Sequence, residues 1–188
     1  MTPMVILLIV VVGAAALFGL FVIGLYNNLQ RRRIAADGAW SDVDVQLKRR
    51  YDLIPNLVET VKGYASHEKG TLEAVIAARQ GAVNARGVAE QAQADNMVTQ
   101  ALGKLFALSE AYPDLKANTN FMALQEELTS TENKVGFSRQ NYNRNASQYN
   151  EAMVVFPGNI VAGMFGFRPM EFFELADATQ RNAPQVKF

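Results

Sequence analysis

The feature that most constrains this chain is an uncharged, largely apolar run of 23 residues, at positions 4–26. At about 1.5 Å per helical residue, such a run can cross a hydrocarbon core about 30 Å thick. A cleavable signal peptide would have a basic stretch before a shorter apolar run, and no Lys or Arg precedes residue 4. A buried core helix would be shorter or show a polar stripe. The sequence therefore predicts a membrane anchor in residues 1–30, with the lipid bilayer as the partner of residues 4–26.

The charges that flank this run predict its orientation. Residues 1–30 contain no Lys or Arg, whereas residues 31–50 contain six. The positive-inside rule places the basic side in the cytoplasm. We therefore expect a single-pass protein with its N-terminus outside and a cytoplasmic helical domain in residues 31–188. A periplasmic domain is the alternative, because three aspartates dilute the basic patch.

Composition excludes several classes of function. The formal net charge is zero, so no nucleic-acid partner is expected. The chain has no cysteine, which excludes disulfides, thiolate zinc sites and cysteine nucleophiles. Its one histidine, His67, excludes multi-histidine metal sites. His67 lies beside Glu68 at an expected helix end, where a capping or surface role is the simpler interpretation.

Helical periodicity dominates the chain after the anchor. Apolar positions three or four residues apart cover more than seven turns: Trp40, Val43, Leu47, Tyr51, Ile54, Val58, Val61 and Ala65. No turn signal separates Tyr26 from this stripe. One helix is therefore expected to leave the membrane and become the first helix of a bundle.

Two further long helices are predicted. The second begins at Gly70 or Thr71, and one face of it carries Leu72, Val75, Ile76, Arg79 and Val83. The Ala-, Gln- and Gly-rich stretch 81–96 is expected to fray or break, and the pattern resumes at Met97. A third helix begins near residues 118–120, where asparagines offer N-caps. Its stripe comprises Phe121, Leu124, Leu128, Thr131, Val135, Ser138, Tyr142, Ala146, Tyr149 and Met153.

Strand patterns are nearly absent, so the predicted fold class is all-α. We expect an N-terminal transmembrane helix that continues into an elongated antiparallel bundle of three long helices plus a short C-terminal helix. Six of the eleven phenylalanines follow residue 155. This aromatic surface could pack on the bundle as a fourth helix, contact another subunit or enter the membrane interface.

Two motifs raise structural questions. Tyr142-Asn143 recurs seven residues later as Tyr149-Asn150, so both pairs share a helix face and fit either packing within the bundle or a subunit contact. Pro55 lies within the span of the first stripe and deprives the Tyr51 carbonyl of its helical donor.

Either Asp52 caps a new helix before Pro55, or the helix continues with a kink. The unbroken stripe favours the second geometry. Arg49 and Arg50 are then expected to meet the carbonyls exposed at the bend.

No catalytic constellation emerges from the sequence. Asp42 and Asp44 point to different sides of a helix, as do Glu126 and Glu127. A glycine-rich phosphate loop and a G-x-S-x-G motif are both missing from the sequence. We therefore predict no catalytic, cofactor-binding or metal-binding residues, no cofactor and no enzymatic activity.

Three stretches resemble the LemA family of bacterial membrane proteins, and the resemblance covers nearly the whole chain. They read RRYDLIPNLVETVKGYASHE (49–68), LTSTENKVGFSRQNYNRNASQYNEA (128–152) and FPGNIVAGMFGF (156–167). The matching residues are Tyr51, Asp52, Leu53, Pro55, Asn56, Leu57, Glu68, Glu132, Tyr142, Asn143, Tyr149, Asn150, Phe156 and Pro157. The resemblance implies an anchored helical bundle in the bacterial cell membrane and supplies no catalytic residues. A relative in magnetosome formation suggests that some members organise membranes.

These observations favour a non-enzymatic, membrane-anchored scaffold that forms homo-oligomers and organises or remodels the membrane. The alternative is an adaptor that docks a membrane-associated enzyme or signalling partner. A hydrolase without a recognisable motif and a ligand-sensing bundle are weaker interpretations. The first would need a pocket that joins His67 to two carboxylates, and the second an apolar cavity inside the bundle.

Overall fold

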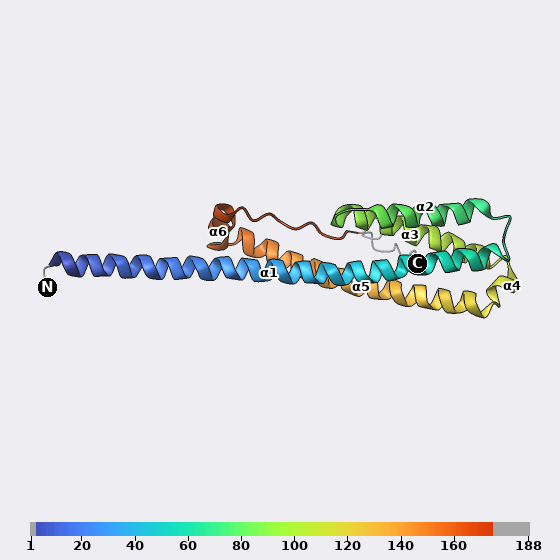
Figure 1. Cartoon of the computed structure of the whole chain (residues 1–188), viewed down its shortest axis with the longest axis horizontal. Helices are drawn as coiled ribbons and strands as arrows, with labels where there is room; N and C mark the ends of the chain where they lie inside the picture. The colour runs from blue at the N-terminus through green and yellow to red at the C-terminus, as the bar shows by residue number, and fades with distance from the viewer. Residues whose placement is uncertain (1–2, 175–188) are drawn as a thin grey trace, which may run out of the picture. The chain divides into compact units, whose positions relative to one another are not determined.

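A computed structural model describes residues 3–174. Every regular element in that range is a helix, which confirms the all-α prediction (Figure 1). The helices are α1 (Pro3–Lys62), α2 (Lys69–Asn84), α3 (Val88–Ser109), α4 (Pro113–Lys116), α5 (Thr119–Val154) and α6 (Gly158–Phe165). The last part of the expected domain, residues 175–188, lies outside the described residues and includes Phe188 of the predicted aromatic tail.

The chain forms two compact units. The first unit comprises Met1–Ala39 and Asn143–Met170, and the second comprises Trp40–Tyr142 and Glu171–Phe188. The long helices α1 and α5 each contribute to both units.

Helix α1 runs without interruption through the apolar run and the predicted stripe, as the sequence indicates. Its large apolar side chains near the N-terminus are exposed, for example Leu8 at 63% and Leu17 at 69%. The stripe positions from Val43 onward are buried, and Trp40 is partly buried. The part of α1 from Trp40 onward therefore contributes to the core of the second unit.

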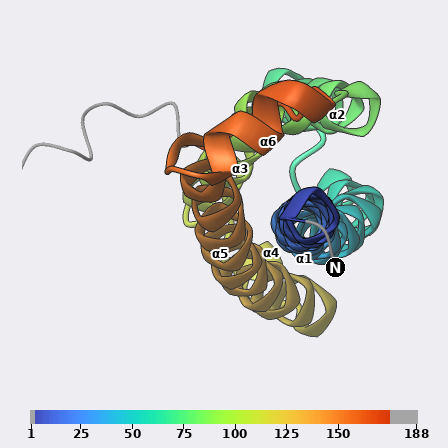
Figure 2. The same cartoon turned by 90° about the vertical axis from the view of Figure 1, so that its left-hand side faces the viewer.

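The second predicted helix is divided into α2 and α3, which pack against each other (Figure 1; Figure 2). The break falls at residues 85–87, inside the stretch expected to break. Gly87 has a φ of +80°, a conformation that residues with a Cβ rarely adopt. The glycine thus permits the reversal that turns one predicted helix into two.

The predicted face of α2 is partly wrong. Leu72 and Val75 are buried, but Ile76 and Val83 are 47% and 56% exposed. In their place the buried positions are Ala78 and Ala82. Small side chains allow two helices to approach closely, so the alanines face the interior although larger apolar residues stand nearby. Met97, where the pattern was expected to resume in α3, is also exposed.

Helix α5 follows its prediction closely. Seven of the ten predicted stripe positions are buried: Phe121, Leu128, Thr131, Val135, Tyr142, Ala146 and Tyr149. The other three are partly buried. Asn118 caps the start of the helix, because its Oδ1 accepts a hydrogen bond from the backbone N–H of Phe121 at 3.0 Å.

Pro55 lies inside α1, so Asp52 does not cap a new helix there. The helix continues, as the unbroken stripe predicts. The Tyr51 carbonyl accepts a hydrogen bond from Nε of Arg79 in α2, at 2.8 Å. The sequence predicts Arg49 or Arg50 as this partner, and that prediction is wrong. Arg49 pairs with Glu127 in α5, and Arg50 pairs with Asp95 in α3. The acceptor that proline leaves unpaired therefore becomes a tie between α1 and α2.

This tie predicts a coupling between Pro55 and Arg79. Arg79→Met keeps the apolar stem but removes the donor, so the part-buried Tyr51 carbonyl loses its charged partner, at a cost of about 1–3 kcal/mol of unfolding free energy. In a Pro55→Ala background the new backbone N–H at position 55 can supply the missing helical bond, and Arg79→Met should cost distinctly less. Denaturant unfolding of the four variants in detergent measures this cycle. Equal costs in both backgrounds would contradict the coupling.

Candidate functional site

The predicted surface role of His67 agrees with its position. It is exposed in the turn between α1 and α2. The neighbouring Glu68 accepts a hydrogen bond from the Tyr112 hydroxyl at 3.1 Å. No group of three or more His, Asp or Glu side chains in residues 3–174 is placed to hold a metal ion.

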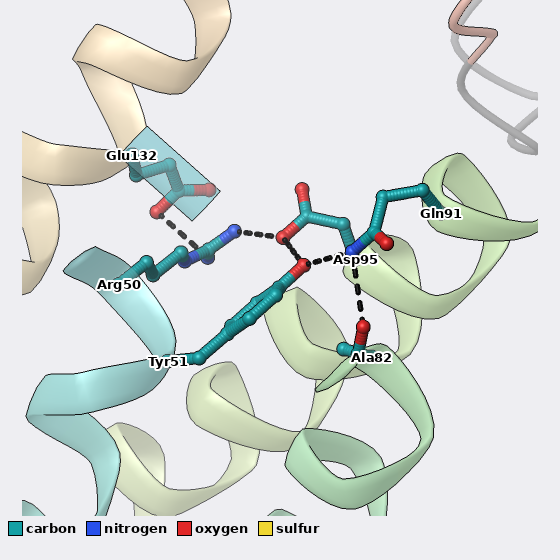
Figure 3. Close-up of polar contacts among 6 residues, drawn as sticks. All are labelled: Arg50, Tyr51, Ala82, Gln91, Asp95 and Glu132. Carbon is teal, nitrogen blue, oxygen red and sulfur yellow. Dashed lines mark hydrogen bonds and ion pairs between the residues drawn. The ribbon is translucent and has the colours of Figure 1, made fainter. Parts of the chain in front are cut away.

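The most unusual chemistry in the structure is a buried polar network in the second unit (Figure 3). Its centre is Arg50 of α1, which is 1% exposed. One terminal nitrogen of Arg50 lies 2.9 Å from Oδ1 of Asp95 in α3. The other lies 3.7 Å from Oε2 of Glu132 in α5, which is half exposed. One buried cation thus joins three helices.

Tyr51 and Gln91 extend the network toward α2. The Tyr51 hydroxyl donates to the same Asp95 oxygen at 3.3 Å. Nε2 of Gln91 donates to the Tyr51 hydroxyl and to the Ala82 carbonyl, both at 3.1 Å. The aspartate therefore accepts from both a guanidinium and a phenol (Figure 3).

Burial dominates the electrostatics of this network. Burial raises the pKa of the Asp95 carboxyl, and the charge of Arg50 opposes that rise. Burial and the nearby Asp95 charge raise the pKa of the Tyr51 phenol well above its ordinary value. Tyr51 therefore stays a neutral hydrogen-bond donor, and the network is suited to holding helices in register.

A groove of about 260 Å³ lies beside the network. Its wall includes Tyr51, Gln91, Lys48, Asp52 and Arg79. Lys48 and Asp52 form an ion pair at 3.0 Å, and Arg79 binds the Tyr51 carbonyl. These charges are thus engaged within the protein and do not converge on the space between them.

Sequence reasoning missed the network, although a signal exists. Arg50 was treated as a charge that sets membrane topology. Yet Val43, Leu47, Arg50 and Ile54 follow one another at gaps of 4, 3 and 4, which places Arg50 on the buried face. The same gaps of 4, 3 and 4 on α3 place Asp95 on a stripe with Gln91, Val98 and Leu102. A cation on one apolar stripe and an acid on another predict a buried pair.

The repeated Tyr-Asn motif makes contacts within the chain, as the packing interpretation predicts. In the first unit, the Tyr149 hydroxyl donates to the Arg168 carbonyl at 3.0 Å. The Asn150 side chain donates to the Met170 carbonyl and accepts from the Met170 N–H, at 2.9 and 2.8 Å. In the second unit, the Tyr142 hydroxyl donates to the Glu171 carbonyl at 2.7 Å.

The seven-residue spacing has a geometric explanation. Seven helical residues rise about 10.5 Å, and three residues of extended chain advance about 10 Å. The tyrosines are seven apart and the carbonyls they bind, those of Arg168 and Glu171, are three apart. The seven-residue repeat therefore spaces the two tyrosine hydroxyls at about the same distance as the two carbonyls that they bind.

The phenylalanine-rich stretch is divided between packed and exposed side chains. Phe173 is 2% exposed, whereas Phe156 and Phe165 are 75% and 54% exposed. In α6, Val161 and Ala162 are buried against Leu29 of α1. One face of α6 therefore packs as a further helix, as predicted. The other face is covered by nothing in the described residues.

One helix in residues 3–174 is long and apolar enough to cross a membrane, and it is α1. None of its most apolar 18-residue window is buried, which is unlike the core helix of a soluble protein. A signal sequence would pass the same test of length and composition. The helical continuity of α1 far beyond the apolar run favours the anchor.

Comparison with known proteins gives consistent matches. A model of the LemA family matches residues 39–188. The magnetosome protein MamQ of Magnetospirillum gryphiswaldense is 25% identical over 175 residues, which cover 79% of this chain and 62% of MamQ. MamQ 2 of Paramagnetospirillum magneticum is also 25% identical, over 79% of this chain and 64% of its own. The chain thus spans a little less than two thirds of these MamQ proteins. Protein LemA of Metamycoplasma hominis is 24% identical over 156 residues, covering 82% of this chain and 71% of that protein.

The buried network predicts a specific pattern of stability. Asp95→Leu alone leaves the Arg50 charge buried beside the half-exposed Glu132, and should cost about 3–5 kcal/mol of unfolding free energy. The double variant Arg50→Met/Asp95→Leu removes both charges and should recover most of that loss. Thermal and denaturant unfolding of the purified full chain measure both. A double variant that is less stable than Asp95→Leu would contradict this account of the network.

Proposed function

The chain belongs to the LemA family, and from that premise we propose that it is a membrane-anchored, non-enzymatic scaffold. Its helical domain self-associates and thereby organises or remodels the membrane. In this proposal, residues 1–30 form the anchor and residues 31–188 form the helical domain. The likeness to the magnetosome protein MamQ supports a role at membranes.

The observation that carries the proposal is the continuity of α1. One helix, Pro3–Lys62, holds both the largely exposed apolar run and the buried stripe of the second unit. An anchor that only tethers a domain can be joined to it by a flexible linker, whose length and composition set its reach. Here the same helix enters the core without a linker. Such continuity suits a protein that transmits position or force between a membrane and a helical domain.

Self-association is proposed to use exposed apolar side chains of the second unit. Phe137 on α5 is 71% exposed, more than any other phenylalanine of that unit with a described side chain. A phenylalanine buries a large area when a partner covers it, so it can anchor a contact between subunits. The adaptor alternative would instead use the groove beside Tyr51 to receive a segment of one partner protein.

The scaffold proposal predicts a defined assembly of the full chain. In nanodiscs or detergent at micromolar concentration, the measured protein mass should be a multiple of the 20.7 kDa chain. Phe137→Ser should shift the distribution toward the monomer, because it removes apolar area from the proposed contact. Gln140→Ser changes another exposed residue on α5 and should leave the assembly intact. Mass photometry or native mass spectrometry gives the masses. A strict monomer with one stoichiometric partner would replace the scaffold by the adaptor.

The proposed orientation places the helical domain in the cytoplasm. Arg31 and Arg33 are exposed just beyond the apolar run, where basic residues favour the cytoplasmic side.

Because the chain has no cysteine, single-cysteine variants report sidedness cleanly. In intact cells, a membrane-impermeant maleimide should label Thr2→Cys and should label Ser130→Cys only after permeabilisation. The opposite pattern would establish a periplasmic domain.

A further inference from the structure

The corner between α5 and α6 begins a stretch without charge. Residues 152–167 contain no Asp, Glu, Lys or Arg, and Glu151 and Arg168 flank them. This stretch includes all of α6. Gly158 makes the corner possible, because a Cβ at that position would collide with the Ala152 carbonyl oxygen. The chain thus places an eight-residue apolar helix tightly against the end of α5.

One face of α6 packs on α1 within the first unit (Figure 1). Val161 and Ala162 are buried against Leu29, and Val22 and Leu25 flank this contact. Tyr26 adds two edge-on ring contacts. Its centroid is 4.9 Å from that of Phe165 and 5.6 Å from that of Phe167.

The other side of α6 and the corner before it carry large apolar side chains that nothing in the described residues covers. They are Val154 (74% exposed), Val155 (53%), Phe156 (75%), Ile160 (53%) and Met164 (71%). Soluble surfaces seldom gather so much apolar area without a partner.

The partners of α6 on α1 define the depth of this face. Val22, Leu25 and Tyr26 are among the last residues of the uncharged run 4–26. That run would be about 34 Å long as a helix, slightly more than a hydrocarbon core of about 30 Å. Its last turn therefore reaches the boundary between acyl chains and headgroups, and α6 lies beside that turn.

We propose that α6 is a second membrane element, whose exposed face inserts into the bilayer interface beside the point where α1 emerges. This inference rests on α1 crossing the membrane. An interfacial helix normally pairs an apolar face with a charged face that stays in water. Helix α6 needs no charged face, because its other side is covered by α1.

Lipid fits this face better than a second protein copy for two reasons. Helix α6 packs on α1 beside Val22 and Leu25, near the end of the apolar run, so a bilayer that surrounds this part of α1 also reaches the exposed face of α6. Each of the two uncharged stretches is also followed by a basic group: Arg168 comes directly after residue 167, where Glu151 precedes the stretch, and Arg31 lies five residues beyond Tyr26. Basic residues at headgroup depth are attracted to anionic lipids.

The test uses full-length, single-cysteine variants carrying an NBD fluorophore in vesicles of phosphatidylcholine and phosphatidylglycerol. The probe position is Met164→Cys. Gln140→Cys is the water-exposed control, because Gln140 is exposed on α5 and its substitution is expected to leave the assembly intact. Leu17→Cys reports the span itself. Quenching is measured with iodide in water and with nitroxide lipids labelled at shallow and deep positions.

We expect the Met164 label to be quenched by shallow nitroxide lipids, with an iodide quenching constant several-fold below that of the Gln140 label. The Leu17 label should respond to deep nitroxides. A Met164 label that matches the Gln140 label would overturn the inference while the span stands. Shielding of Met164 from both quenchers would assign the face to a second protein copy and overturn it too. A Leu17 label without deep quenching would show that α1 does not cross the membrane, and would overturn the proposed function as well.

Discussion

The enclosed charge of Arg50 is the interaction on which the second unit depends. A guanidinium that is 1% exposed is stable only with partners, since an isolated charge is strongly disfavoured in a low-dielectric interior. Asp95 and Glu132 meet this need from α3 and α5. Because both carboxylates must reach one cation, a shift of either helix along α1 would break one of its two ion pairs. The ion pair therefore specifies helix register more than it adds stability.

Tyr51, in the same turn of α1, contacts two neighbouring helices. The Tyr51 hydroxyl binds Asp95 in α3, while the Tyr51 carbonyl, left without a helical donor by Pro55, binds Arg79 in α2. A proline that would weaken an isolated helix thus supplies an acceptor for a neighbouring helix. This explains why the stretch from Arg49 onward is so distinctive. It encodes contacts between helices.

Sequence periodicity predicted α1 and α5 well, because each presents large apolar side chains at helical spacing over many turns. It failed on α2, where Ala78 and Ala82 face the interior and the larger Ile76 faces out. It missed the pairing of Arg50 with Asp95, because the Arg50 charge was taken as a signal of membrane topology. Its position on the buried stripe of α1 was not considered. The contacts of Tyr149 and Asn150 were beyond reach for another reason. Their partners are backbone atoms, which leave no trace in side-chain patterns.

A membrane-bound scaffold must also control the position of its span along the bilayer normal. A lone apolar helix can slide or tilt at modest cost when its length exceeds the hydrocarbon thickness. An interfacial α6 would oppose both displacements. Motion of α1 toward the side of the helical domain would expose Phe156, Ile160 and Met164 to water. Motion in the opposite direction would draw Arg168 and Arg31–Arg33 from the headgroup region into the hydrocarbon core. Because α1 continues without a linker to Lys62, this resistance would fix the height of the residues that enter the helical domain. Copies held at one height could meet through the same side chains, which a self-associating scaffold requires.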